Sequence, residues 1–288
     1  MPYVYLILSV FCSASTNVFG KWFNRRCEGM KDTSIFYNFL QLTAVFLGWC
    51  ILFAMNPSFD GRVLLYSILF GLCFFSCNLG IINALKYGPT TLTSLFISMS
   101  LLVTTTWGFI FWDTKFTIFV ALGLILMTIS VYLFLKTDKK EETKFSFRWL
   151  FYVLLALFGN SGCSIVQRTQ QVQFHGEHGS MLMLFASGFS ALVCLGFYLK
   201  SDKKDSVPLL RNCGWLPVLA GAGNIFLNLL VMRLALTDLS PGLIYPVLSA
   251  GGLMVVTLFS IVLFREKLRK RQWIGIATGA LAIVLLSL

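Results

Sequence analysis

The chain has 288 residues, of which 57% are hydrophobic and 12% are charged, and its mean hydropathy is +0.79. Soluble domains carry about a quarter charged residues, so this composition excludes a soluble globular protein and indicates a chain that crosses a membrane several times. The net charge of +11 does not indicate nucleic-acid binding, because the basic residues lie in short segments between apolar runs and form no continuous basic face.

Ten apolar segments follow one another along the chain, and each has the length of a membrane-spanning helix. A helix rises about 1.5 Å per residue, so about 20 residues cross a hydrocarbon core of about 30 Å. The segments are residues 2–20, 33–55, 62–84, 89–111, 116–135, 149–169, 179–199, 214–234, 241–264 and 272–288. The sequence therefore predicts an all-α membrane protein with ten transmembrane helices.

A polar stretch, KTDKKEETKFSF, separates the fifth segment from the sixth. Five spans place the two ends of a half on opposite sides of the membrane, so a second five-span half must enter the membrane upside down. We therefore expect a first five-helix repeat over residues 1–135, a cytoplasmic linker over 136–147, and a second, inverted repeat over 148–288. Inverted repeats build many secondary carriers, whose solute site lies near the middle of the membrane.

The two halves carry polar residues at matching places. Ser9, Ser13 and Asn17 recur every four residues in the first segment, and Asn160, Ser164, Gln167 and Gln171 recur every three or four residues in the sixth. Each set lies on one helix face. When Ala84 is set against Ala235, Cys73 and Cys77 align with Asn224 and Asn228, and the pair Ser94 and Ser98 aligns with Tyr245 and Ser249. This matching indicates a duplicated sequence.

The interior of the apolar segments contains amides and hydroxyls but no Asp or Glu. An unpaired amide in hydrocarbon costs roughly 2–7 kcal/mol. Each polar group therefore either hydrogen-bonds a neighbouring helix, a contact of about 0.6–2 kcal/mol, or lines a wet cavity that binds a solute. The candidate solute-binding residues are Ser13, Asn17, Ser94, Ser98, Asn160, Ser164, Gln167, Asn224, Asn228, Tyr245 and Ser249.

The residues that usually hold metals or cofactors are sparse. None of the eight cysteines belongs to a CxxC pair, and His175 and His178 lie in a short loop without a third ligand nearby. We therefore predict no metal, no cofactor and no catalytic residue.

Loop charge predicts the orientation. Nineteen of the 23 basic residues lie in the loops on one side of the predicted membrane, and four lie on the other. Because basic loops stay in the cytoplasm, we expect the central linker inside the cell and both termini outside, in a plasma or inner membrane.

The five-plus-five layout, the string ALKYG (84–88) before a Ser/Thr-rich segment, and FREKLRKRQWIGIATGALAIVL (264–285) resemble the drug/metabolite transporter superfamily, in its ten-helix EamA-like branch. The resemblance implies a secondary carrier that works by alternating access without ATP. Two features depart from it. Family members usually have cytoplasmic termini, and the small four-helix relatives carry a Glu in the first span, where this chain has Ser13, Ser15, Thr16 and Asn17. Cation export driven by that Glu is therefore not expected.

The function predicted from the sequence is secondary active transport of a small polar or amphipathic metabolite. Two alternatives stay open: a membrane-embedded lipid-modifying enzyme, which would need clustered His, Asp or Glu, and a scaffold that transports nothing. The expected partners are a small-molecule solute and the lipid bilayer, without nucleic acid. Gly275 and Gly279 allow close helix contact within or between subunits, so the chain is expected to be a monomer or a homodimer.

Overall fold

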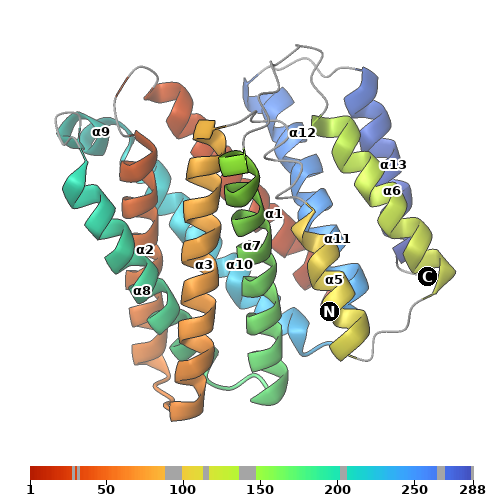
Figure 1. The fold of residues 1–288 in the computed structure, drawn as a ribbon, viewed down its shortest axis with the longest axis horizontal. Coiled ribbons are helices and arrows are strands. Elements are labelled where there is room, and N and C mark those ends of the chain that lie inside the picture. Colours follow the sequence, from red (N-terminus) through yellow and green to blue (C-terminus); the bar gives the residue numbers. More distant parts are fainter. Residues whose placement is uncertain are drawn as a thin grey trace. The chain divides into compact units, whose positions relative to one another are not determined.

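The computed structural model describes residues 1–27, 30, 33–87, 99–112, 117–135, 147–201, 206–264 and 270–286. Within these residues every regular element is a helix (Figure 1), so the predicted all-helical fold is confirmed. The elements are α1 (Pro2–Arg26), α2 (Thr33–Met55), α3 (Gly61–Tyr87), α5 (Ser100–Phe111), α6 (Ile118–Leu135), α7 (Phe147–Gln173), α8 (Gly179–Lys200), α9 (Ser206–Cys213), α10 (Trp215–Ala235), α11 (Pro241–Pro246), the π-helix η1 (Val247–Gly251), α12 (Gly252–Phe264) and α13 (Lys270–Leu286).

Six helices in the described part of the chain are long and apolar enough to cross a membrane, namely α1, α2, α3, α7, α8 and α10. They coincide with predicted segments one, two, three, six, seven and eight. Shorter apolar helices occupy the described parts of the other four segments. The membrane-protein class is thus confirmed, whereas the count of ten spans stays a prediction.

Several helices differ from the predicted segments. Helix α1 continues to Arg26, beyond the predicted end at residue 20, and α3 continues to Tyr87, beyond residue 84. Helix α7 continues to Gln173, beyond the predicted end at residue 169, because glutamine side chains in its last turn are bonded inside the protein rather than solvated. Helix α9 was not predicted. Its eight residues, SVPLLRNC, are too few to show a clear period, and they follow a charged stretch that is typical of a loop.

The ninth predicted span contains a change of helix type. Pro246 has no N–H, so it cannot make the helical bond to the carbonyl of residue 242. The next turn, Val247–Gly251, is π-helical before α12 resumes the α-helix. Single π turns inside α-helices occur frequently at functional sites, and this one contains the candidate residue Ser249.

The helices form two compact units. Apart from the first two residues, the first unit contains residues 3–72 and 167–236, and the second contains residues 73–166 and 237–288. In the first unit, α2 packs against α8 and α10. In the second unit, α6 lies along α13 and α5 contacts α11 (Figure 1). Helices α3 and α7 each contribute one part to each unit.

Glycines allow close helix contacts in both units. In the second unit, a Cβ on Gly80 would lie 2.5 Å from the backbone nitrogen of Ala156, and one on Gly159 would lie 2.6 Å from that of Cys77. The backbones of α3 and α7 therefore touch, as small residues permit in membrane helices. In the first unit, a Cβ on Gly221 of α10 would lie 3.1 Å from the carbonyl of Gln41 in α2.

We expect Gly80→Ala to destabilise the protein, because the added methyl group would force α3 away from α7. Overpacking of this kind costs about 1–3 kcal/mol. Gly196→Ala is the matched control. Its Cβ would meet nothing within 4 Å, and alanine favours the helix by about 1 kcal/mol over glycine. Thermal unfolding of the purified protein in detergent measures both effects. Equal melting temperatures for the two variants would contradict the proposed contact.

Candidate solute-binding site

Three predicted amides come together in the first unit. The side-chain nitrogen of Gln167, on α7, donates to the side-chain oxygen of Asn228 on α10 over 3.1 Å. Asn228 in turn donates to the side-chain oxygen of Asn224 over 3.0 Å and to its carbonyl over 2.9 Å. Each primary amide has two N–H donors and one carbonyl oxygen that can accept two hydrogen bonds. This amide cluster therefore has hydrogen-bonding capacity beyond the bonds that join its members.

The two glutamines that follow Gln167 have a structural role. Gln171 donates to the side-chain oxygen of Gln170 over 2.6 Å, and Gln170 donates to the carbonyl of Glu177 over 2.9 Å. Both side chains are buried. They hold the turn between α7 and α8, where Gly176 has the positive φ of +84° that glycine adopts without strain. Gln171 therefore lies on the predicted polar stripe but stabilises a turn.

A second polar group joins α7 to α5 in the second unit. Asn160 donates from its side chain to Ser100 Oγ over 2.7 Å, and Ser161 Oγ donates to the carbonyl of Ser100 over 2.9 Å. Asn160 was a predicted site residue. Ser100 and Ser161 were not, because Ser161 lies off the three-to-four-residue spacing and a contact between residues 61 apart leaves no local signal.

Tyr245 meets the predicted stripe of α7 in the second unit. Its side chain is buried, and its hydroxyl donates to the carbonyl of Ser164 over 3.3 Å. Ser164 Oγ lies 3.5 Å from the carbonyl of Asn160. Ser249 lies in η1, one turn after Tyr245. The candidates Ser94 and Ser98 lie outside the described residues.

The polar stripe of α1 is largely bonded to its own helix. Asn17 donates to the carbonyl of Ser13 over 2.9 Å, and Ser9 donates to the carbonyl of Tyr5. Asn17 is nevertheless exposed, although it shares a helix face with Leu6 and Val10, which are buried.

Asn160 has the same setting on α7. It is exposed, yet it shares a face with Trp149 and Val153, which precede it by eleven and seven residues and are buried. Leu6 and Val10 precede Asn17 by the same spacings. Both asparagines are therefore exposed on helix faces whose residues two and three turns earlier are buried.

Charged and aromatic side chains gather where α3 begins in the first unit. Arg62 forms an ion pair with Asp60 at 2.7 Å, and its guanidinium lies 5.3 Å from the ring centre of Phe174. Hydrogen bonds from Arg62 lower the pKa of the Asp60 carboxyl to about 2. Tyr66 donates to the side-chain oxygen of Gln173. Residue spacing does not predict this group, because it joins α3 to α7 across more than 100 residues.

We expect the link between Gln167 and Asn228 to contribute about 0.5–1.5 kcal/mol to stability, which is the usual range for a hydrogen bond between helices. A double-mutant cycle with Gln167→Ala and Asn228→Ala measures this coupling as unfolding free energy. Thr43→Ala is the control partner for Gln167→Ala, because among the residues that the structure describes Thr43 bonds only the carbonyl of Phe39 in its own helix. If the effects on unfolding free energy are additive in both pairs of variants, Gln167 and Asn228 are not coupled and the proposed link is wrong.

Comparisons with known proteins agree with this architecture. Three Bacillus proteins named "Putative sugar uptake protein", two from Bacillus cereus strains and one from Bacillus anthracis, are 27% identical over 257 residues, which cover 85% of this chain and 84% of each relative. A Pseudomonas fluorescens protein named "Probable 4-amino-4-deoxy-L-arabinose-phosphoundecaprenol flippase subunit ArnE" is 33% identical over 115 residues, which cover 37% of this chain and 95% of that protein.

One solved crystal structure matches with a TM-score of 0.72 and 14% identity, covering 97% of this chain and 95% of its own, and it shares the fold. The family model described as "EamA-like transporter family" matches residues 1–136 and again residues 147–288. The chain therefore belongs to the EamA-like transporter family, within the drug/metabolite transporter superfamily.

Proposed function

We propose that this chain is a secondary active transporter that moves a small, uncharged, hydroxyl-rich solute across the membrane by alternating access. The observation that carries the proposal is the polar stripe of α7. It presents Asn160, Ser164 and Gln167 on one helix face, and Gln167 is bonded to further amides on α10. The solute would bind along this stripe.

The chemistry of the stripe favours a neutral solute. A primary amide places a donor beside an acceptor, and a sugar hydroxyl is both donor and acceptor, so the two pair well. A cation would need a carboxylate within the membrane interior to balance its charge. The interior of the predicted spans contains no Asp or Glu. The names of the Bacillus relatives refer to sugar uptake. The ArnE name also refers to a sugar, carried there on a phosphorylated lipid.

We base alternating access on two related halves, and the pairing of helices supports the presence of such halves. In the predicted alignment, α2 and α8 are the second spans of the two halves, and α6 and α13 are the fifth. Each of these pairs packs together within one unit. The family model also matches twice, once on either side of residues 137–146. We therefore propose an inverted repeat with boundaries near residues 135 and 148.

Close contacts recur at positions that the alignment of the two halves places within one residue of each other. Setting Lys21 against Arg168 aligns Ser15 with Gly162. In the first unit, a Cβ on Gly223 would lie 2.8 Å from Ser15 Oγ. In the second unit, a Cβ on Gly162 would lie 2.5 Å from Cys73 Sγ, and Cys73 aligns with Asn224, the neighbour of Gly223. A duplicated helix crossing accounts for both contacts.

Transport by reconstituted protein tests the function. We expect liposomes containing the purified chain to exchange a labelled monosaccharide or polyol, and Gln167→Ala to reduce this exchange about fivefold to tenfold, as expected for one lost hydrogen bond. Asn78→Ala is the matched control, because within the described part of the chain the Asn78 side chain bonds only the carbonyl of Phe74 in its own helix. No exchange across a panel of sugars, polyols, nucleosides and amino acids, or a folded Gln167→Ala that equals wild type, rejects the proposal.

Loop charge further leads us to propose that both termini face outward. A cysteine introduced at Lys139, in the central linker, is then expected to resist a membrane-impermeant thiol reagent in intact cells and to react after the cells are opened. Labelling of this cysteine in intact cells would contradict the proposed orientation and place the central linker outside. The same experiment with a cysteine at Asp60 is expected to give the opposite result.

A further inference from the structure

Two tryptophans and an arginine form a compact group at the junction of α1 and α10 in the first unit. The rings of Trp22 and Trp215 meet edge to face, with centres 5.3 Å apart at an angle of 84°. The guanidinium carbon of Arg26 lies 5.2 Å from the centre of the Trp22 ring and 5.8 Å from that of Trp215. We call Trp22, Arg26 and Trp215 the Trp–Arg clamp.

The clamp lies where two membrane spans end on the same side. The apolar part of α1 ends at Phe23, and that of α10 begins at Trp215. Tryptophan is enriched at this depth, where its ring meets the headgroup region. Contacts with both rings hold the guanidinium in place by cation–π attraction. Arg26 is exposed, so its planar set of N–H donors, which suits a phosphate, stays accessible.

Helix α9 gives this end of the unit an amphipathic surface. Leu209 and Cys213 pack into a buried cluster with Phe23 of α1. On the other face, Val207 is 75% exposed and Leu210 is 56% exposed, although both are apolar. A helix that exposes apolar side chains beside a basic residue, here Arg211, is typical of one lying in the membrane interface with its apolar face among acyl chains.

The charge of this region favours an anionic partner. The described residues of α1, α8 and α9 that flank the buried cluster at this end, 21–27, 198–201 and 206–213, contain five basic residues and no acidic one. Clusters of Lys and Arg beside membrane spans attract anionic lipid headgroups. Apolar surface for an acyl chain and an immobilised guanidinium for a phosphate therefore occur together at one end of the unit.

We propose that the Trp–Arg clamp and α9 form a binding site for an anionic phospholipid. Arg26 binds the headgroup phosphate, the two tryptophans fix the guanidinium at headgroup depth, and an acyl chain packs on Val207 and Leu210. This site is separate from the polar stripe of α7, and it does not depend on which solute the protein carries.

Lipid retention and thermal unfolding of the full chain test the site. The protein is placed in nanodiscs of phosphatidylcholine, alone or mixed with phosphatidylglycerol, and bound lipid is counted by native mass spectrometry. We expect phosphatidylglycerol to be retained and to raise the melting temperature. Arg26→Ala is expected to weaken this binding about tenfold, as loss of a hydrogen bond to a charged group does. Leu210→Ser is expected to weaken it as well.

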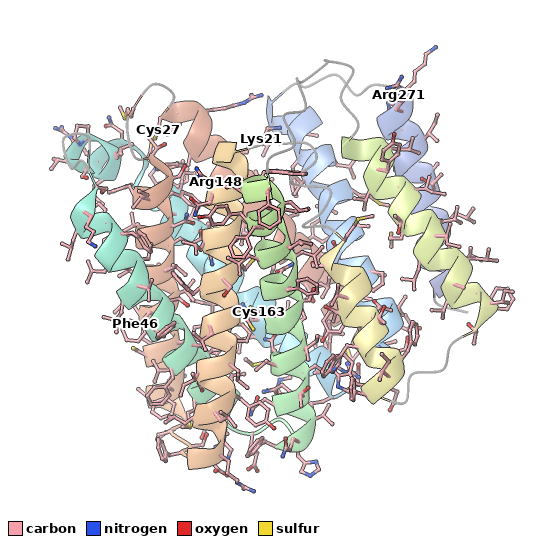
Figure 2. All side chains as sticks on the ribbon, viewed as in Figure 1. Lys21, Cys27, Phe46, Arg148, Cys163 and Arg271 are labelled. Carbon is pink, nitrogen blue, oxygen red and sulfur yellow. The ribbon has the colours of Figure 1, made fainter. Side chains whose placement is uncertain are left out.

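Two further variants distinguish a specific lipid-binding site from non-specific electrostatic attraction of anionic lipid. Arg26→Lys keeps the charge but loses the planar donors, so it is expected to retain less phosphatidylglycerol than wild type. Arg271→Ala removes one exposed charge at the start of α13, in the second unit (Figure 2), and is expected to bind phosphatidylglycerol as wild type does. The proposal is overturned if Arg26→Lys equals wild type, or if Arg271→Ala weakens binding as much as Arg26→Ala.

Discussion

The constraint that shapes this protein is the cost of placing an amide or hydroxyl in hydrocarbon without a partner, roughly 2–7 kcal/mol. The described residues meet it in two ways. Asn17, Asn78 and Asn83 donate to a carbonyl of their own helix four residues back, which requires no second helix. Gln167 and Asn160 instead donate across helices. Bonds of the second kind fix the positions of neighbouring helices, and they place several polar groups on one face of α7.

Helix α7 combines close backbone packing with bonds to other helices. Gly80 and Gly159 bring the backbones of α3 and α7 into contact, and polar groups of α7 bond α5, α10 and α11. In the second unit this helix meets Ser100 and Tyr245, and in the first unit it meets Asn228. A single long helix thus carries three of the eleven predicted site residues, and two more, Asn228 and Tyr245, bond to it.

The sequence predicted most of the fold because apolar length is a direct consequence of membrane thickness. The six clear spans were found to within a few residues. It missed α9, whose eight residues are too short for a period, and it ended the first and sixth segments before α1 and α7 end. The site was predicted in part. Helical spacing identified Asn160 and Gln167, whereas Ser100, Ser161 and Tyr66 depend on contacts between residues far apart in the chain, which spacing cannot predict.

The central claim is that the face of α7 bearing Asn160 opens to water rather than to lipid. Cysteine reactivity measures this directly, because a hydrophilic thiol reagent attacks the thiolate, which forms only in water. Asn160→Cys and Phe158→Cys are compared by mass spectrometry of the modified peptide, since Phe158 is 59% exposed on an apolar face. The account predicts fast labelling at position 160, slowed by a transported solute, and slow labelling at position 158. Equally slow labelling at both positions would contradict it.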